Sequence, residues 1–175
     1  MSRAERTRPF RLLAVVDDSE ATKRMLAYVT RFLIRAGADE RIFVCLGYIL
    51  PTMPARLLEF GGSENPGAEK RLTKTLKKRQ GEWTTAAEAI PDRCLAKARS
   101  HLQRAGVAAS MIDICMTSPL DQRSPVDEVM LLAREQECGT IVLGRHAHGW
   151  FEGGRDHLAS HLVSEAKGVA IWVIT

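Results

Sequence analysis

Five short apolar runs recur along the chain, and stretches with helical periodicity lie between most of them. The runs are Arg11–Val16, Arg41–Ile49, Ala108–Met116, Thr140–Leu143 and Val169–Ile174. They are mostly continuous rather than alternating and too short for helices, which is typical of strands buried on both faces of a sheet. The third run alternates at Met111, Asp113 and Cys115, so we expect it to have a less covered face or to lie nearer the sheet edge.

The segments between the runs carry start and stop signals for helices. Asp17-Asp18-Ser19 precedes an amphipathic stripe of apolar residues, and Gly37 ends that stripe. Ser124, followed by a proline and an acid, marks the start of another helix. A third helical pattern covers Glu82–Gly106, and we expect Pro91 to end or kink its first part.

Alternation of buried strands with helices predicts an α/β fold. We expect an open, mainly parallel five-stranded sheet with helices on both faces, a Rossmann-like architecture. A length of 175 residues fits one domain over 1–175. Prolines and glycines punctuate the segment from about 50 to 81, which we interpret as a surface insertion (Leu50 to Gly81).

Composition and cysteine usage indicate a cytoplasmic protein with no membrane segment. Apolar residues make up 45% of the chain and charged residues 26%, which is ordinary globular usage. The longest apolar runs are far shorter than the roughly 20 residues of a membrane helix, and the arginine-rich N-terminus is unlike a secretory signal. The four cysteines form no C-x-x-C pair and fall mostly in apolar segments, which predicts reduced thiols in the core.

The net charge of +4 comes from one segment. Six of the 25 basic residues lie there without an acid, and the remaining 19 face 21 acidic residues. They are Lys70, Arg71, Lys74, Lys77, Lys78 and Arg79. Such a run is either a nucleic-acid contact or a solvated helix face that Leu72 and Leu76 dock to the body. Because no aromatic residues interleave to stack on bases, we expect the second and no nucleic-acid partner.

Two segments resemble the universal stress protein family. LLAVVDDSEATKRMLAYV resembles the family's opening strand, its V-D-x-S turn and its first helix, here Val16, Asp17, Asp18 and Ser19. CGTIVLGRHAHGWFEGGRDHLASHLVSEAKGVAIWVIT follows the family's spacing from its fourth strand to its C-terminal strand. The resemblance implies an adenine nucleotide-binding architecture with Asp17 as the adenine-side acid. Asp17 and Gly144 are then expected across the switch point between the first and fourth strands.

The phosphate loop of the family is altered in this sequence. ATP-binding members carry G-x-x-G, nine residues, then G followed by Ser or Thr, and these positions are Gly144, Ala147, His157 and Leu158 here. Such a loop brings backbone N–H groups and a helix N-terminus against phosphates. His157 adds a ring and Leu158 lacks a hydroxyl donor, so we expect a degenerate pocket, meaning one whose phosphate-holding residues have been replaced.

A rearranged anion site that binds ATP or AMP is the alternative, since Ser160 stays near the helix start and the loop keeps other glycines. The candidate pocket comprises Asp17, Asp18, Gly144, Ala147, His157, Leu158 and Ser160.

Other chemistry finds little support in the sequence. His146, His148, His157 and His161 fall close together, and the last two share a helical spacing that resembles metal-ligand spacing. A loop near a helix N-terminus gathers polar residues that face solvent, so we interpret the histidines in this way and expect no metal. No hydrolase or kinase motif occurs, so we name no catalytic residue.

Three functions therefore follow from the sequence. The first is a non-enzymatic stress-response or regulatory protein, homodimeric through Val169 to Ile174 as the resemblance implies, with a degenerate nucleotide pocket. The second is an ATP- or AMP-binding universal stress protein acting as a nucleotide-gated switch or slow ATPase. The third is a protein- or nucleic-acid-binding module that uses the basic insertion.

Overall fold

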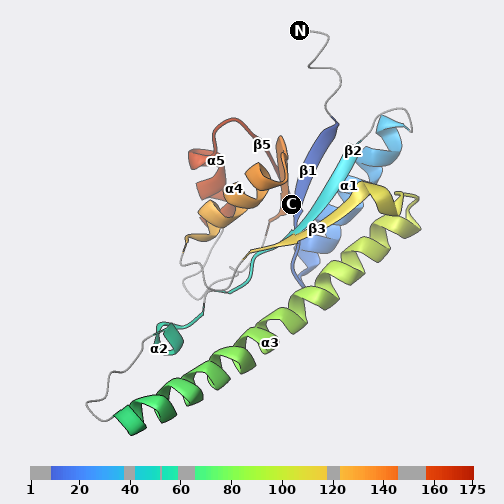
Figure 1. Ribbon diagram of the computed structural model, residues 1–175. Coiled ribbons are helices and arrows are strands. Elements are labelled where there is room, and N and C mark those ends of the chain that lie inside the picture. The colour runs from blue at the N-terminus through green and yellow to red at the C-terminus, as the bar shows by residue number, and fades with distance from the viewer. Residues whose placement is uncertain (1–8, 38–41, 52, 59–65, 118–122, 146–156) are drawn as a thin grey trace.

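The computed structural model describes residues 9–37, 42–51, 53–58, 66–117, 123–145 and 157–175, and these form an α/β fold (Figure 1). The strands are β1 (Phe10–Val15), β2 (Ile42–Tyr48), β3 (Ile112–Met116), β4 (Thr140–Gly144) and β5 (Ala170–Ile174). The helices are α1 (Glu20–Ala36), α2 (Ala55–Leu58), α3 (Pro66–Arg104), α4 (Pro125–Glu135) and α5 (His157–Glu165), with a 3₁₀ turn η2 (Ala109–Met111) before β3.

The sheet confirms the predicted open parallel architecture. Its order is β3-β2-β1-β4-β5, and every neighbouring pair is parallel. The strand order reverses between β1 and β4, which is where ligands bind in such sheets. β3 lies at an edge with alternating burial, as its alternating sequence predicted.

Helices cover both faces of the sheet and enclose two apolar clusters. Successive residues of a strand point to opposite faces, so Leu12 and Ala14 join one cluster while Leu13 and Val15 join the other. The first cluster lies under α1 and the C-terminal half of α3, and the second lies under α4 and α5. Their central residues are fully buried, so both helical layers depend on the same central strand.

The predicted helix signals are where the sequence placed them. The Ser19 hydroxyl accepts a hydrogen bond from the Thr22 N–H at 3.2 Å, and the Ser124 hydroxyl accepts one from the Asp127 N–H at 3.2 Å. Both serines satisfy N–H groups that have no partner inside the helix. Gly37 follows α1 with φ of 85°, a conformation that costs little only for glycine.

A polar pair on the sheet explains why Asp113 interrupts an apolar strand. The Arg11 guanidinium reaches from β1 to the Asp113 carboxylate at 2.6 Å and crosses β2 on the way. The same guanidinium lies 5.4 Å from the centre of the Phe43 ring, and its Nε donates to the Gln136 carbonyl at 2.7 Å. This ion pair therefore ties three strands together at the amino end of the sheet.

Helix α3 joins the second part of the expected insertion to the helical pattern expected over Glu82–Gly106. It is one helix of 39 residues, so residues 66–81 of the expected insertion are helical, and Pro91 lies within the helix without ending it. After Gly67 the sequence is rich in alanine, lysine, arginine and leucine, which are strong helix formers, and their propensity outweighs the glycine and proline signals. Leu72 does not dock the helix to the body, because it is 52% exposed.

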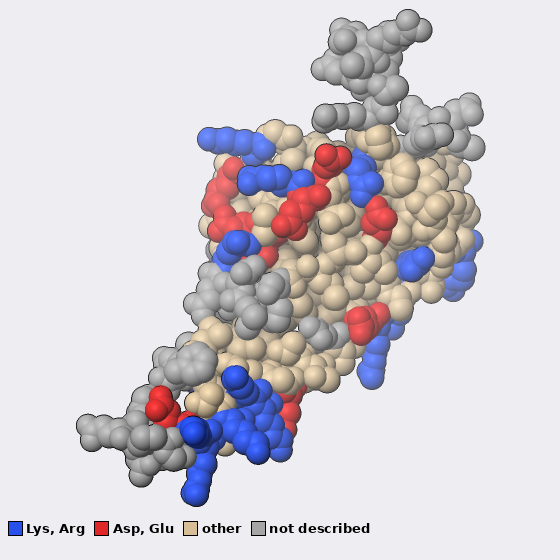
Figure 2. Space-filling model, viewed as in Figure 1, with Lys and Arg blue, Asp and Glu red and all other residues tan. Residues whose placement is uncertain are grey.

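The N-terminal half of α3 extends beyond the sheet, and Lys and Arg side chains gather on it (Figures 1 and 2). α2 lies beside it, where the Gln80 side chain donates to the Leu57 carbonyl at 2.5 Å. A helix of 39 residues is roughly 58 Å long, which exceeds the length of any strand of this sheet. Within the described ranges, no helix is both long and apolar enough to cross a membrane.

The two halves of α3 should differ in their contribution to stability. Leu102 is fully buried against the sheet, so we expect Leu102→Ala to lower the free energy of unfolding by about 2–5 kcal/mol. Leu72→Ala, on the exposed half of the same helix, should change it by less than about 0.5 kcal/mol. Urea denaturation followed by circular dichroism measures both, and equal losses would contradict this arrangement.

Candidate functional site

The switch point between β1 and β4 brings three of the predicted site residues to one end of the sheet. Asp17 and Asp18 follow β1, and Gly144 is the last residue of β4. Asp17 is buried and Asp18 is exposed. The first turn of α1 starts beside the ends of β1 and β4 and contacts Gly144. It therefore forms one wall of the switch point.

The Asp17 carboxylate is held by the N-terminal turn of α1. Its Oδ1 accepts hydrogen bonds from the Ser19 N–H at 2.9 Å, from the Ser19 hydroxyl at 2.5 Å and from the Thr22 hydroxyl. The Asp17 N–H in turn donates to Thr22 Oγ1 at 3.0 Å. A carboxylate beside a helix N-terminus is stabilised by the helix dipole, so this network has a structural role whether or not a ligand binds.

Gly144 is required by packing. A Cβ at this position would lie 2.5 Å from the Ala21 carbonyl oxygen and 2.9 Å from the Ala21 Cβ, closer than real side chains approach. The end of β4 therefore lies against the backbone of α1 with no room for a side chain. The one loop glycine that this sequence keeps has a reason that involves no phosphate.

The remaining site residues belong to the loop after β4 and to α5. Leu158 is half-buried and packs against the apolar cluster under α4 and α5, whereas Ser160 is exposed. His157 is the first residue of α5, but its side chain and the whole of Ala147 lie outside the described residues. The structure thus joins Leu158 to the core, where the family motif has a hydroxyl.

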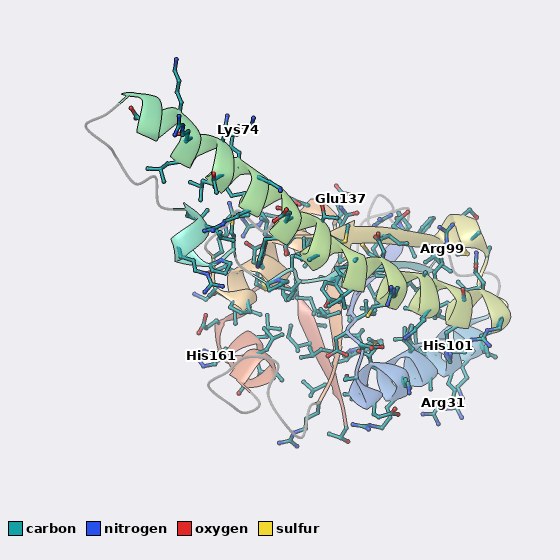
Figure 3. The ribbon with its side chains drawn as sticks, turned by 90° about the horizontal axis from the view of Figure 1, so that it is seen from below. Arg31, Lys74, Arg99, His101, Glu137 and His161 are labelled. Atoms are coloured by element: carbon teal, nitrogen blue, oxygen red, sulfur yellow. The ribbon has the colours of Figure 1, made fainter. Side chains whose placement is uncertain are left out.

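A cavity of about 470 Å³ lies between α1 and α3, next to Asp17 and Asp18. Its other lining comes from the first two turns of α1 and from Cys94, Lys97, Ala98, His101 and Arg104 of α3. Figure 3 labels His101 on α3. Apolar side chains line part of it, while Lys97 Nζ and Asp18 Oδ1 pair at 3.1 Å. The lining thus combines apolar side chains with both acidic and basic ones.

Sequence reasoning missed the α3 side of this cavity. Cys94, Ala98 and His101 recur at helical spacing, so a signal was present, but it indicates only that they share one face of a helix. The spacing does not show that these residues face Asp17. A long segment separates them from Asp17 in the sequence, and local patterns do not determine how that segment folds.

The cysteines are free thiols, as predicted. Cys45, Cys94 and Cys138 are buried and Cys115 is half-buried. The sulfur atoms of Cys45 and Cys115 lie 2.9 Å apart, and this hydrogen bond is the main cause that raises the pKa of Cys45 to about 12. A thiol with such a pKa stays protonated at neutral pH, so Cys45 is a packing residue rather than a nucleophile.

The histidine cluster is only partly described. His146 and His148 lie outside the described residues, and His161 Nδ1 lies 3.0 Å from Glu165 Oε1 on the surface of α5 (Figure 3). Across the part of the chain that the structure describes, no three His, Cys, Asp or Glu side chains are grouped as metal ligands.

A substitution at Gly144 tests the close approach of β4 to α1. We expect Gly144→Ala to lower the free energy of unfolding by about 1–3 kcal/mol, since the new methyl group must push α1 away from β4. Gly139→Ala is the matched control, because a Cβ at Gly139 meets nothing within 4 Å, and its effect should stay below about 0.5 kcal/mol. Thermal or urea unfolding gives both values, and a neutral Gly144→Ala would refute the close approach.

The sequence matches no protein-family model, and no curated protein matches it. Solved structures do match over nearly the full length. A universal stress protein from Archaeoglobus fulgidus has a TM-score of 0.57 at 14% identity, covering 98% of both chains. One from Burkholderia pseudomallei has a TM-score of 0.55 at 15% identity, covering 94% of both. The Archaeoglobus fulgidus protein in complex with dAMP has a TM-score of 0.55 at 15% identity, covering 96% of this chain and 98% of the other. The predicted resemblance is thus confirmed at the level of structure, and the chain has the fold of the universal stress proteins.

Proposed function

We propose that this chain is a non-enzymatic regulatory protein of the universal stress type, acting in the cytoplasmic stress response as a homodimer with a degenerate nucleotide pocket. The observation that carries the proposal is the place of Leu158. A residue that should donate a hydroxyl to phosphate instead packs into the apolar cluster under α4 and α5. Four free cysteines, three of them buried, agree with a reducing compartment.

Two further features support the degenerate pocket. Gly144 is explained by its contact with Ala21, so it is no evidence for a phosphate loop. The Asp17 carboxylate already accepts hydrogen bonds from Ser19 and Thr22, which give it a role in starting α1. Each retained motif residue therefore has a structural reason, and Leu158 lacks the hydroxyl that would donate to phosphate.

A nucleotide-gated switch is the second candidate. Structures with the same fold contain dAMP and, in another universal stress protein, cAMP. The buried Asp17 and the adjoining cavity of about 470 Å³ keep space beside the switch point. A nucleotide that binds there would have to engage its phosphates with groups other than those of the family loop.

Nucleotide binding separates the two candidates. We expect equilibrium dialysis with ATP and Mg²⁺ to show no saturable binding by the unmodified protein at micromolar concentrations. Restoring the motif with Ala147→Gly, His157→Gly and Leu158→Ser should create measurable affinity, because glycine backbone and a hydroxyl then face the phosphates.

The matched control for this variant carries Leu158→Ala in place of Leu158→Ser, and it differs only in the hydroxyl. It should bind ATP more weakly than the restored variant. Micromolar, magnesium-responsive binding by the unmodified protein would instead establish the nucleotide-gated switch.

The homodimer proposal rests on the exposed edge at β5. Among the strands that the structure describes, β5 pairs with β4 alone, and its apolar residues Ile171, Trp172, Val173 and Ile174 are half-buried. Close to it, Tyr28 of α1 packs edge-on against Trp172 and is itself 39% exposed. An apolar edge strand presents unpaired backbone groups to another chain, and a second copy paired along β5 satisfies them.

Sedimentation equilibrium tests the dimer. We expect a mass of twice 19.4 kDa at micromolar concentration, and a shift toward monomer for Val173→Lys, which places a charge on the edge strand. Val163→Lys is the control, because Val163 lies on α5 and is 62% exposed, and its mass should not change. If the unmodified protein sediments as a monomer, the homodimer through β5 is excluded.

A further inference from the structure

The N-terminal half of α3 carries a cluster of exposed cations. Lys70, Arg71, Lys74, Lys77, Lys78 and Arg79 are all exposed, and no acid interrupts residues 70–79. Figure 2 shows them together at one end of the molecule, and Figure 3 shows Lys74 on the part of α3 that extends beyond the sheet. Lys78 Nζ lies 3.7 Å from Glu82 Oε1, and this exposed pair offsets one of the six positive charges.

Helix geometry aligns most of these cations on one side. At about 100° per residue, five of the six fall within an arc of roughly 120°, and Arg79 lies outside it. Between residues 69 and 85, the other members of this arc are Gly81 and Thr85. The arc, which we call the cationic face, thus contains no apolar side chain and no carboxylate.

Contacts with the rest of the protein lie on other sides of the helix. Gln80, whose amide donates to the Leu57 carbonyl at 2.5 Å, is about 120° from the centre of the cationic face. The apolar residues Leu72, Leu76 and Trp83 lie about 180° from that centre. The cationic face is therefore open to a partner while α2 and the apolar strip face away from it.

Charge and composition decide what kind of partner fits. A protein interface usually has an apolar core, and the cationic face offers none. A membrane that took up the apolar strip would turn the cationic face away from the lipid headgroups, so the two features oppose each other. Binding to a polyanion needs only exposed cations at a suitable spacing, which is what this helix supplies.

Dimensions favour a duplex over a single strand. From Lys70 to Lys78 the helix rises about 12 Å, and a helix about 10–12 Å in diameter fits the major groove, which is about 12 Å wide. No aromatic residue lies on the cationic face, so unpaired bases would find nothing to stack on. The face also has no Asn or Gln to read adenine edges, and its Lys and Arg side chains are of the types that most often contact phosphates.

We propose that the cationic face of α3 binds the phosphate backbone of double-stranded nucleic acid without reading its sequence. The sequence alone favoured a solvated helix face docked by Leu72 and Leu76. In the structure Leu72 is 52% exposed, Leu76 is half-buried, and this half of the helix projects beyond the sheet. The proposal is independent of the nucleotide pocket and of its state.

Fluorescence anisotropy with a labelled 20-base-pair DNA duplex tests the proposal on the full chain. With at most five phosphate contacts, the logarithm of the association constant should fall with the logarithm of salt concentration with a slope of about −3 to −4.5. The variant with Lys70, Arg71, Lys74, Lys77 and Lys78 all changed to Gln should lose at least about tenfold in affinity at low salt. Glutamine is a good helix former, so circular dichroism should show the helix content unchanged.

The control variant removes the same net charge elsewhere. It changes Arg31, Arg35, Arg93, Arg134 and Lys167 to Gln, all of which are exposed. This variant should bind within about threefold of the unmodified protein, since distant charges act only through screened, long-range attraction. Equal losses in both variants would overturn the proposal and indicate net charge alone.

Two competitors distinguish the partner class. Unlabelled duplexes of unrelated sequence should displace the probe equally, whereas poly-L-glutamate of matched charge should compete much less. Equal competition by the polypeptide would overturn the assignment to nucleic acid. So would binding to vesicles of anionic phospholipid that the cationic-face variant abolishes while duplex binding is unaffected.

Discussion

The packing of both helical layers onto β1 is the constraint on which the rest of this structure depends. β1 hydrogen-bonds to β2 on one side and to β4 on the other, and its alternate side chains supply the centre of both apolar clusters. Leu12 and Leu13 point to opposite faces and are both fully buried. Where the strand ends, the chain must turn into α1 at once, and Asp17, Ser19 and Thr22 accomplish this with side-chain hydrogen bonds. The close approach of Gly144 to Ala21 follows from the same geometry, because β4 lies directly beside β1.

Much of the fold could be predicted because its signals are local. Continuous apolar runs, the caps at Ser19 and Ser124 and the glycine after α1 each act within a few residues, so they mark strands and helix ends directly. The alternation at Asp113 correctly placed β3 at an edge, although its ion pair with Arg11 could not be seen from spacing. The length of α3 was not predicted, because the prolines and glycines up to Gly67 and Pro91 indicate breaks. The strong helix formers between them outweigh these signals.

The candidate site shows the same difference between residues with local signals and residues whose role depends on long-range packing. Asp17 and Gly144 could be placed at one switch point because the resemblance to the universal stress protein family implies that arrangement, and the observed strand order has β1 and β4 side by side. What Leu158 contacts, and why Gly144 must be glycine, depend on packing between distant segments and became visible only in three dimensions. The cavity between α1 and α3 is the extreme case, because Asp18 and Lys97 are 79 residues apart and meet across it. A shared motif position is therefore weak evidence for a shared ligand when packing alone explains the residue.

Helix α3 combines an anchored half with a charged half, and this division has an energetic consequence. Its C-terminal half buries Leu95, Ala98 and Leu102, so the helix direction is fixed by the core. Its N-terminal half places like charges four residues apart, as at Lys70 and Lys74, and each such pair destabilises a helix by a few tenths of a kcal/mol. The fold sustains this repulsion because the anchored half and α2 hold the helix in place. An anion bound along the cationic face would remove the repulsion as well as add attraction, so a polyanion gains binding free energy there that a neutral surface cannot.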